Sequence, residues 1–294
     1  MNVLSLFDGM SCGQIALNRV GIKYDKYFAS EIDENGIQVT MDNYPNTIQL
    51  GDVTKIISSN LPQIDLLIGG SPCQGFSFAG KQLNFTDPRS MLFFEFVRLK
   101  NECKPKYFLL ENVKMRKDFQ DIISGYLGVE PIEINSSTVS AQDRKRLYWT
   151  NIPNITQPTN KNIHLKDVLD VFVDDKLFLS DTIASRYFTV PCTINKNKSC
   201  VIGKLSNHQG DRIFDINCKG SSLSASGGNN GAGGCNIIHD PTTNKLRKLS
   251  VSECERLQTV PENYTKSANK TQRYKMLGNG WTVDIIAHIF KNII

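Results

Sequence analysis

The chain has 294 residues, 40% of them hydrophobic, and its 34 basic and 29 acidic residues give a net charge of +5. That length allows one large core, or one core and a smaller lobe. No window holds the roughly 18 consecutive apolar residues of a membrane span, so no membrane association is expected. The segment Met1–Gly9 resembles a first strand more than a signal peptide, which predicts a cytoplasmic protein.

Apolar runs alternate with helical patterns from residue 1 to about residue 150. Strands that alternate with helices predict a doubly wound α/β fold, with a mostly parallel sheet covered on both faces. The expected strands are 3–6, 27–30, 65–68, 107–110 and 146–150. The expected helices are 13–20, 34–43, 90–103 and 118–127.

The pattern changes after residue 151. The stretch 151–245 is rich in Asn, Thr, Ser and Lys, with short strand-like pieces such as Phe188–Val190. Its Gly- and Ser-rich segment, 219–234, is either a plain flexible loop or a loop whose backbone approaches another molecule closely. This stretch therefore predicts a second, irregular domain.

Regular patterns return near the end of the chain, where helices are expected at 250–258 and 281–294. The last helix is expected to pack on the first domain, which makes the second domain an insertion. We predict a first domain of residues 1–151 and 276–294, and a smaller β-containing domain, 152–275, inserted near the C-terminus.

Cysteine usage bears on disulfides and metal. The chain has eight cysteines, and disulfides are not expected in the cytoplasm. Four cysteines and two histidines of the second half lack the CxxC or HxxxH spacing typical of zinc sites, so we expect no metal. They are Cys192, Cys200, Cys218, Cys235, His208 and His239.

Basic residues gather in the segment 241–275, which has eight basic and three acidic residues. A local basic surface is what contact with a polyanion requires. A solvated helix face would carry the same lysines, and that alternative stays open. Lys245, Arg247 and Lys248 are the candidates for contact with a polyanion.

The first expected strand runs into Phe7-Asp8-Gly9-Met10-Ser11-Cys12-Gly13 and then a helix. A strand, a turn of small residues and a helix N-terminus form a pocket of nucleotide type. Glu31 ends the second strand, where a carboxylate can accept hydrogen bonds from a ribose diol. Asp52, directly after Gly51, can accept from an adenine amino group. Either acid could instead be a helix N-cap or a first-turn charge.

A thiol, a carboxyl group and two arginines form a second set. Cys73, in GGSPCQGFS, and Glu111, in the tripeptide ENV, both follow apolar strands, which places them at the carboxyl edge of the sheet. Arg144 and Arg146 lie at the start of another strand, and nearby arginine favours a thiolate and stabilises an anionic intermediate. The set predicts a cysteine nucleophile. The alternatives are an inert buried cysteine and a surface acid.

Seven segments, in this order, carry a family resemblance: FDGMSCG, SPCQGFS, DPRSMLFFEFVRL, ENV, QDRKRLYW, RKLSVSECERLQTVP and LGNGWTV. They resemble the motifs of the DNA (cytosine-5)-methyltransferases, most closely the compact bacterial and phage type. Ser11 stands where many members have glycine, and Trp281 follows Gly-Asn-Gly where many have Gly-Asn-Ser. Residues 152–245 offer no match.

The resemblance implies a Rossmann-like, S-adenosylmethionine-dependent fold with a target-recognition domain. It implies methyl transfer from S-adenosyl-L-methionine to carbon 5 of a cytosine in double-stranded DNA. Cys73 would add to carbon 6 of a flipped base, since a thiol cannot reach that atom in the stack. Glu111 would hydrogen-bond ring nitrogen 3 and the amino group. Arg144 and Arg146 would help hold the base and the adjacent phosphate.

The resemblance also implies which residues bind the cofactor and the DNA. Phe7 would face the adenine, and 74–90 would be a loop that closes over DNA. The expected cofactor-binding residues are Phe7, Asp8, Gly9, Ser11, Gly13, Glu31, Ile32, Asp52, Val53, Pro72, Leu92, Asn279 and Trp281. The expected DNA-binding residues are Gln74, Ser77, Arg89, Gln142, Lys245, Arg247 and Lys248.

Two alternative functions stay open. A transfer RNA methyltransferase of the same family would carry Cys-Phe-Thr in its second half, and here no cysteine precedes Phe188-Thr189. A non-catalytic DNA-binding homologue would be expected to lose Cys73 or Glu111, and both are present. We expect a monomer that serves restriction-modification or protects phage DNA. Its recognition sequence is not predictable from these motifs.

Overall fold

The computed structural model describes residues 1–72, 88–192, 194–207, 211–225 and 236–293, and for 88–90 only the backbone. The chain divides into two compact units. The first is Met1–Ile134, Lys145–Gln157 and Ile286–Ile294, and the second is Asn135–Arg144 and Pro158–Ile285. The predicted domains, 1–151 with 276–294 and 152–275, are defined by the function expected of each, and their boundaries stay a prediction.

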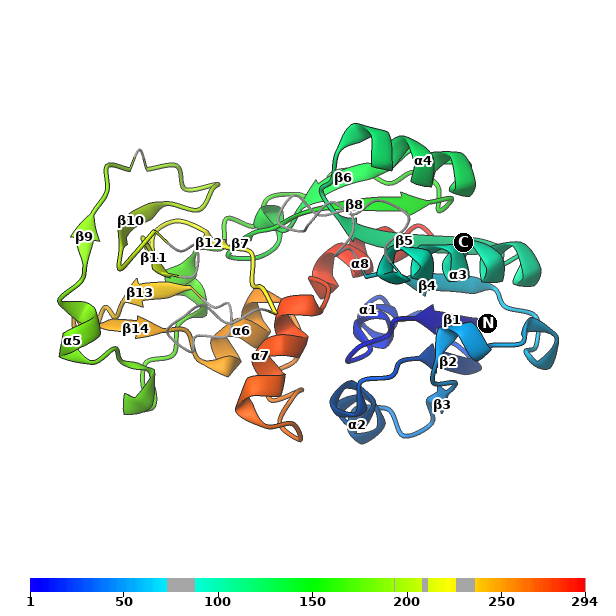
Figure 1. Cartoon of the computed structure of the whole chain (residues 1–294), viewed down its shortest axis with the longest axis horizontal. Helices are drawn as coiled ribbons and strands as arrows, with labels where there is room; N and C mark the ends of the chain where they lie inside the picture. The colour runs from blue at the N-terminus through cyan, green and yellow to red at the C-terminus, as the bar shows by residue number, and fades with distance from the viewer. Residues whose placement is uncertain (73–87, 193, 208–210, 226–235, 294) are drawn as a thin grey trace. The chain divides into compact units, whose positions relative to one another are not determined.

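A mostly parallel sheet forms the centre of the first unit. Its described strands are β1 (Asn2–Leu6), β2 (Lys26–Ser30), β3 (Ile48–Gln49), β4 (Leu66–Gly69), β5 (Tyr107–Val113), β6 (Ile132–Asn135) and β8 (Lys145–Thr150). They lie in the order β3-β2-β1-β4-β5-β8-β6 (Figure 1). The pairs from β3 to β5 are parallel, and β8 is antiparallel to β5. The predicted doubly wound α/β class is confirmed.

Helices cover both faces of this sheet. They are α1 (Cys12–Arg19), α2 (Glu34–Asn43), α3 (Pro88–Cys103), α4 (Lys117–Leu127) and α8 (Val283–Phe290), with the 3-10 helices η1 (Val53–Lys55) and η2 (Ser58–Asn60). Successive side chains of a strand point to opposite faces. Leu67 of β4 belongs to one buried cluster with Phe93 of α3 and Phe119 of α4. Ile68 points the other way, against Gly13 of α1.

The buried cluster under α3 and α4 fixes the strands that carry the candidate site. Each Leu or Phe in it contributes roughly 1.5–3 kcal/mol by leaving water. Trp149 of β8 is fully buried, and its Nε1 donates to Ser124 Oγ of α4 at 3.0 Å. Because its polar atom has a partner, the indole packs without an unsatisfied donor. This contact anchors β8 beside β5.

The second unit has short strands of two to four residues and long irregular segments. One sheet has the order β14-β13-β11-β10-β9 and another pairs β12 with β7. The strands are β7 (Gln142–Asp143), β9 (Phe188–Thr189), β10 (Val201–Lys204), β11 (Arg212–Phe214), β12 (Gly220–Ser221), β13 (Ile237–His239) and β14 (Leu246–Lys248). The helices are η4 (Ser136–Thr138), η5 (Leu165–Val168), η6 (Asp175–Leu177), α5 (Asp181–Ala184), α6 (Val251–Leu257) and α7 (Lys270–Asn279).

The second unit agrees with the predicted elements in part. The strand-like piece at Phe188 is β9, and the helix expected at 250–258 is α6. Helix α7 is not predicted, because its sequence KTQRYKMLGN has no apolar period. The helix expected from residue 281 begins at Val283.

Three general properties follow for the described part of the chain. No helix there is long and apolar enough to cross a membrane. No group of three or more His, Cys, Asp or Glu side chains there could hold a metal ion. The described cysteines form no disulfide.

Candidate active site

The loop between β1 and α1 has a strained backbone. Phe7, Gly9 and Ser11 have φ angles of 56°, 59° and 60°. For residues with a Cβ this left-handed conformation costs about 1–2 kcal/mol each. Such backbone persists only where the surroundings hold it, and it concentrates at functional sites. The loop therefore marks the end of β1 as a candidate binding site, as FDGMSCG predicts.

Glu31, at the end of β2, holds this loop in place. Its Oε2 accepts the Gly9 N–H at 2.7 Å, and its Oε1 accepts the N–H groups of Ile32 and Asp33 at 2.8 and 2.9 Å. A carboxylate has about four acceptor positions, so capacity remains for a hydroxyl of a ligand. Ile32 beside it is 75% exposed. The two side chains fit a ribose and an adjoining apolar ring, and those roles stay predictions.

Two glycines allow close packing of the neighbouring helices, Gly13 of α1 against the sheet and Gly36 of α2 against the loop. A Cβ at Gly13 would lie 2.4 Å from Ile68 Cδ1 and 2.7 Å from the Tyr27 hydroxyl. A Cβ at Gly36 would lie 2.8 Å from the Gly9 carbonyl oxygen. Gly13, predicted to bind the cofactor, thus has a packing role. Gly36 was missed, although a glycine inside a helical pattern signals close packing.

Asp8 is part of this loop, and its carboxyl group is buried in the first unit. Its Oδ1 accepts from the Tyr27 hydroxyl at 2.8 Å, while Oδ2 is buried with no hydrogen-bond partner among the described residues. Burial raises the pKa of Asp8 to about 6, although hydrogen bonds from Ser5, Ser11 and Tyr27 oppose the rise. Asp8 therefore changes charge in the mildly acid range.

Asp52, after β3, is the N-cap of η1. Its Oδ1 accepts from the Thr54 N–H at 3.0 Å and from the Thr54 hydroxyl at 2.8 Å. These bonds hold the pKa of Asp52 below its usual value. The N-cap alternative is thus present, and it does not prevent the carboxylate from accepting a further bond. Val53, the next predicted contact, is buried in the core cluster.

Glu111 and Arg146 meet at the carboxyl end of β5. In the antiparallel pair β5–β8, Glu111 faces Tyr148, so Arg146 is its diagonal neighbour on the same face. Arg146 Nε lies 3.0 Å from Glu111 Oε1, and the side chains are 14% and 11% exposed. A partly exposed, charge-assisted hydrogen bond of this kind orients both groups toward a ligand.

Asn112 ties the end of β5 to the segment before Cys73. Its Nδ2 lies 3.3 Å from Ser71 Oγ and 3.4 Å from the Ser71 carbonyl oxygen, and its Oδ1 accepts the Val113 N–H. Asn112 and Ser71 are both buried. Sequence reasoning named Asn112 only as the residue beside Glu111, and a buried amide there was not foreseen.

Several predicted residues lie at or beyond the limits of the described chain. Cys73, Gln74 and Ser77 lie outside the described residues, and Arg89 has only its backbone described, in α3. Pro72 is half-buried directly before them. Phe7 and Leu92 are partly buried against the core cluster.

Gln142 and Arg144, in the second unit, are directed at the chain itself. Arg144 is 2% exposed, and its guanidinium donates to the carbonyl oxygens of Leu223, Gly278 and Gly280. Gln142 is fully buried. In this structure the polar groups of both side chains bind the chain itself, and their expected base, phosphate and DNA contacts stay predictions. Both residues connect segments of the second unit.

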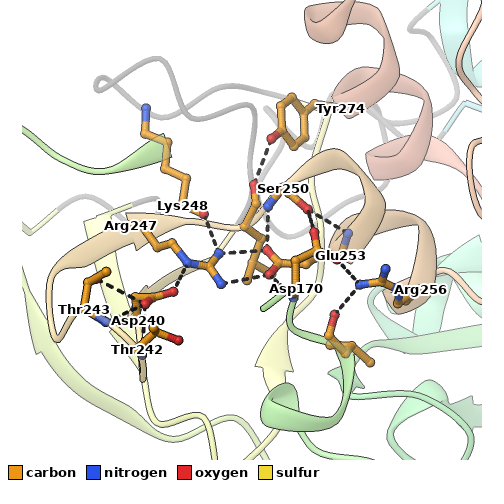
Figure 2. A network of polar contacts seen from close by, with 12 residues as sticks. Asp170, Asp240, Thr242, Thr243, Arg247, Lys248, Ser250, Glu253, Arg256 and Tyr274 are labelled. Atoms are coloured by element: carbon orange, nitrogen blue, oxygen red, sulfur yellow. Dashed lines mark hydrogen bonds and ion pairs between the residues drawn. The ribbon is translucent and has the colours of Figure 1, made fainter. Parts of the chain in front are cut away.

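Arg247 is another buried cation. It has no exposed surface, and Figure 2 shows it between Asp240 and Glu253. Its Nε lies 2.5 Å from Asp240 Oδ2, and its Nη1 and Nη2 each lie 2.9 Å from a Glu253 oxygen. Glu253 also completes the capping box of α6 with Ser250. In this structure the charge of Arg247 is thus paired internally, and its predicted DNA contact stays a prediction.

Every arginine of the segment 241–275 has an acidic partner, whereas several lysines face solvent. Arg256 pairs with Asp170 and Glu262, and Arg273 with Glu255. The exposed lysines are Lys245, Lys266, Lys270 and Lys275, and Lys248 is half-buried. Phosphate contacts in this segment are therefore to be sought among its lysines.

Asn279 and Trp281 lie at the end of α7 and just beyond it. Asn279 is exposed, and Trp281 is half-buried. Gly278, before them, packs so closely that a Cβ would lie 2.3 Å from the carbonyl carbon of Ser224. The predicted cofactor contacts of Asn279 and Trp281 stay predictions.

Comparison with known proteins decides the family. A model described as C-5 cytosine-specific DNA methylase matches residues 1–294. The chain belongs to this family. It is 30% identical to Type II methyltransferase M1.ScrFI of Lactococcus lactis subsp. cremoris, over 99% of this chain and 77% of the relative. It is 28% identical to Type II methyltransferase M.HhaI of Haemophilus parahaemolyticus, over 100% of this chain and 94% of the relative.

Solved structures agree on the fold. The Entamoeba histolytica methyltransferase EhMeth superposes with a TM-score of 0.77 at 17% identity, over 100% of this chain and 99% of that one. A putative DNA modification methyltransferase encoded within an E. coli prophage gives 0.71 at 19%, over 100% and 98%. The predicted family, methyltransferase fold and enzyme class, a DNA (cytosine-5)-methyltransferase, are confirmed. The family implies a methyl donor of the S-adenosylmethionine type.

Proposed function

We propose that this methyltransferase uses S-adenosyl-L-methionine to methylate carbon 5 of a cytosine flipped out of double-stranded DNA, through a covalent bond between Cys73 and carbon 6. The observation that carries the proposal is the Glu111–Arg146 pair, 3.0 Å apart and partly exposed. Asn112, next to Glu111, is bonded to Ser71, two residues before Cys73. The carboxyl group and the nucleophile segment are thus tied to one edge of the sheet.

The proposed reaction balances as an addition, a transfer and an elimination. The Cys73 thiolate forms a bond to carbon 6, and the electron pair of the carbon 5–carbon 6 double bond becomes available at carbon 5. Glu111 hydrogen-bonds ring nitrogen 3 and the amino group, while Arg146 orients Glu111 and stabilises the negative charge on the ring. Carbon 5 takes the methyl group as the methyl–sulfur bond of the sulfonium breaks, which would leave a neutral thioether. The carbon 5 proton then passes to water, and its electron pair re-forms the double bond as the Cys73 thiolate departs.

The residues at the ends of β1 and β2 fit the cofactor that this chemistry needs. When bound, S-adenosylmethionine supplies an electrophilic methyl group. Glu31, with acceptor capacity left beside the strained loop, would hold its ribose. The exposed Ile32 and the partly buried Phe7 would contact the adenine, and Asp52 would accept from the adenine amino group.

The test is methyl transfer from labelled cofactor to DNA and to transfer RNA in parallel. Transfer to DNA is expected, and Cys73→Ser is expected to abolish it. DNA containing 5-fluorocytosine should form a covalent adduct with the wild-type enzyme only, because the fluorine cannot leave as a proton does. Full activity of Cys73→Ser would reject the mechanism, and methylation of transfer RNA alone would reject the substrate.

We propose a role in restriction-modification or in protection of phage DNA. Several relatives are named Type II methyltransferases, and another is the orphan methyltransferase M.Rho11sI of Bacillus phage rho11s. Bisulfite sequencing of DNA from cells that express the enzyme reports the product and the recognition site together. Unmethylated DNA in such cells would contradict the role.

A further inference from the structure

Two segments far apart in the sequence run side by side in the second unit. Strand β7 pairs with β12 in parallel, with Gln142 opposite Gly220 and Asp143 opposite Ser221. The Ser222 hydroxyl donates to the Asp143 carbonyl oxygen at 3.1 Å. The QDRKR segment therefore forms a platform for the chain that leads into the Gly-rich stretch at 226–235.

Both main-chain polar groups of the next residue, Leu223, are bound by side chains. Its N–H donates to Gln142 Oε1 at 2.8 Å, and its carbonyl oxygen accepts from Arg144 Nη1 at 2.9 Å. Leu223 is 4% exposed. Two side chains, Gln142 on β7 and Arg144 just after it, thus fix both main-chain polar groups of Leu223, and neither group has water to replace a lost partner.

The same two side chains also contact the end of α7 and the end of α6. Arg144 Nη2 donates to the carbonyl oxygens of Gly278 and Gly280 at 3.2 and 3.0 Å. Gln142 Nε2 donates to the Leu257 carbonyl oxygen at 3.1 Å and lies 3.2 Å from Gln258 Oε1. Gln142 and Arg144 are therefore held rigidly, and they can hold Leu223 in turn.

We infer that Gln142 and Arg144 are positioning residues for DNA recognition: by clamping the backbone of Leu223, they fix the position of the segment 220–225 in the second unit, and so which cytosines are methylated. The inference rests on the proposed function, because it presumes a DNA substrate. Neither residue touches the base in this role.

The physical effect of the clamp is on discrimination between DNA sites. Base readout requires side chains held at the groove edges within a fraction of an ångström. If the clamped segment shifts, contacts to the preferred DNA site weaken and other sites are accepted. The difference between the affinities for the preferred site and for other sites then falls. The chemical step, at Glu111 and Arg146, depends on other contacts.

The test compares Gln142→Leu with Ser140→Ala. Gln142→Leu keeps the side-chain volume and removes the bond to the Leu223 N–H. Ser140→Ala is the matched control, because the buried Ser140 hydroxyl also donates to the Leu257 carbonyl oxygen, at 2.6 Å, without contacting Leu223. The preferred site is first found in the wild type by bisulfite sequencing. KM for DNA, kcat, the cofactor Kd and methylation of single-base variants of that site are then measured.

Gln142→Leu is expected to raise KM for the preferred DNA and to lower discrimination by roughly tenfold each, as misplacement of a recognition element does. Its kcat and cofactor Kd should stay within about twofold of wild type. Ser140→Ala should change none of these. Equal effects of the two variants, or a loss confined to kcat in Gln142→Leu, would overturn the inference. A wild-type enzyme that methylates no DNA would instead reject the proposed function.

A second variant covers the case in which Gln142→Leu does not fold. Ser222→Ala removes only the half-buried hydroxyl that binds the Asp143 carbonyl oxygen. It should lower discrimination in the same direction, by a smaller factor, with kcat unchanged. Suppose that Gln142→Leu fails to fold while Ser222→Ala discriminates between DNA sites as well as the wild type does. That result would show that the clamp has no effect on recognition, and it would overturn the inference.

Discussion

The edge of the sheet in the first unit and the interior of the second unit use ion pairs differently. At the sheet edge, Arg146 and Glu111 lie 3.0 Å apart and keep 14% and 11% of their side chains exposed. In the second unit, Arg247 and Glu253 lie 2.9 Å apart with no exposure at all. The partly exposed pair still has surface that a ligand can reach, whereas the fully buried pair could bind a ligand only by leaving a charge without its partner. A pair of one arginine and one glutamate is therefore partly open to solvent in the first unit and fully enclosed in the second.

The same contrast occurs within five residues of the segment QDRKR. The boundary between the two units falls between Arg144 and Lys145. Arg146, on one side, pairs with Glu111, and Arg144, on the other, donates to carbonyl oxygens of the second unit. Variants of Arg144 and Arg146, and of the two kinds of ion pair, test one question. It is whether side-chain exposure distinguishes residues needed for the reaction from residues needed for folding.

The largest effect is expected from Glu253→Ala. This change leaves Arg247 buried without its main carboxylate and removes the capping box of α6, so it should destabilise folding by about 3–5 kcal/mol. Glu262→Ala is the control, because Glu262 is 57% exposed in its pair with Arg256 and such a pair contributes about 0–1 kcal/mol. Urea unfolding measures both. Similar losses in the two variants would show that burial does not distinguish these pairs.

Arg146→Gln is expected to act on the rate. Removing one preorganised donor at a reacting group typically lowers kcat by about 10²–10³, and the free energy of unfolding should change little because the side chain is at the sheet edge. Arg144→Gln should do the reverse, since it leaves buried carbonyl oxygens without a donor. Single-turnover methylation and urea unfolding of both variants give the comparison. An Arg144→Gln enzyme with normal stability and a kcat as low as that of Arg146→Gln would contradict it.

Sequence reasoning succeeded where local patterns decide the structure and failed where distant segments meet. The apolar runs around Glu111 and Arg146 predicted two strands, and their antiparallel pairing brings the charges together. Arg144 and Arg247 carry the same side chain as Arg146, but Leu223 and Asp240 decide their burial. No pattern within a segment shows such partners, which is why the burial of Arg144 and Arg247 was not foreseen from the sequence.

Asp8 is an exception to the comparison, because its carboxyl group is buried in the first unit and no cationic partner for it lies among the described residues. Its pKa of about 6 lies above the ordinary value of 3.8, so its protonated form stabilises the folded state. That stabilisation is full below about pH 4 and is lost as the pH rises through about 6, a difference of about two pKa units or roughly 3 kcal/mol. Asp8→Asn should remove this dependence.

Urea unfolding between pH 4 and 7.5 measures the effect at Asp8. Relative to Asp8→Asn, the wild type should lose about 2–3 kcal/mol across this interval. A difference between the two proteins that stays constant with pH would show that Asp8 has an ordinary pKa. The cofactor Kd, measured at pH 7.5, reports whether the substitution also changes the loop Phe7–Ser11.

The smallest effect is expected from Lys245→Gln, compared with Arg247→Gln two residues away. Lys245 is exposed and Arg247 is buried. If Lys245 contacts a phosphate, its loss removes one counterion from binding and lowers the slope of log K against log salt by about 0.9, with no loss of stability. Arg247→Gln should instead destabilise the fold and leave the slope unchanged in the protein that stays folded. DNA binding from 50 to 200 mM salt, together with urea unfolding, separates the two. A slope that falls only for Arg247→Gln would mean that the buried ion pairs open on DNA, and that exposure in the free protein does not identify its DNA contacts.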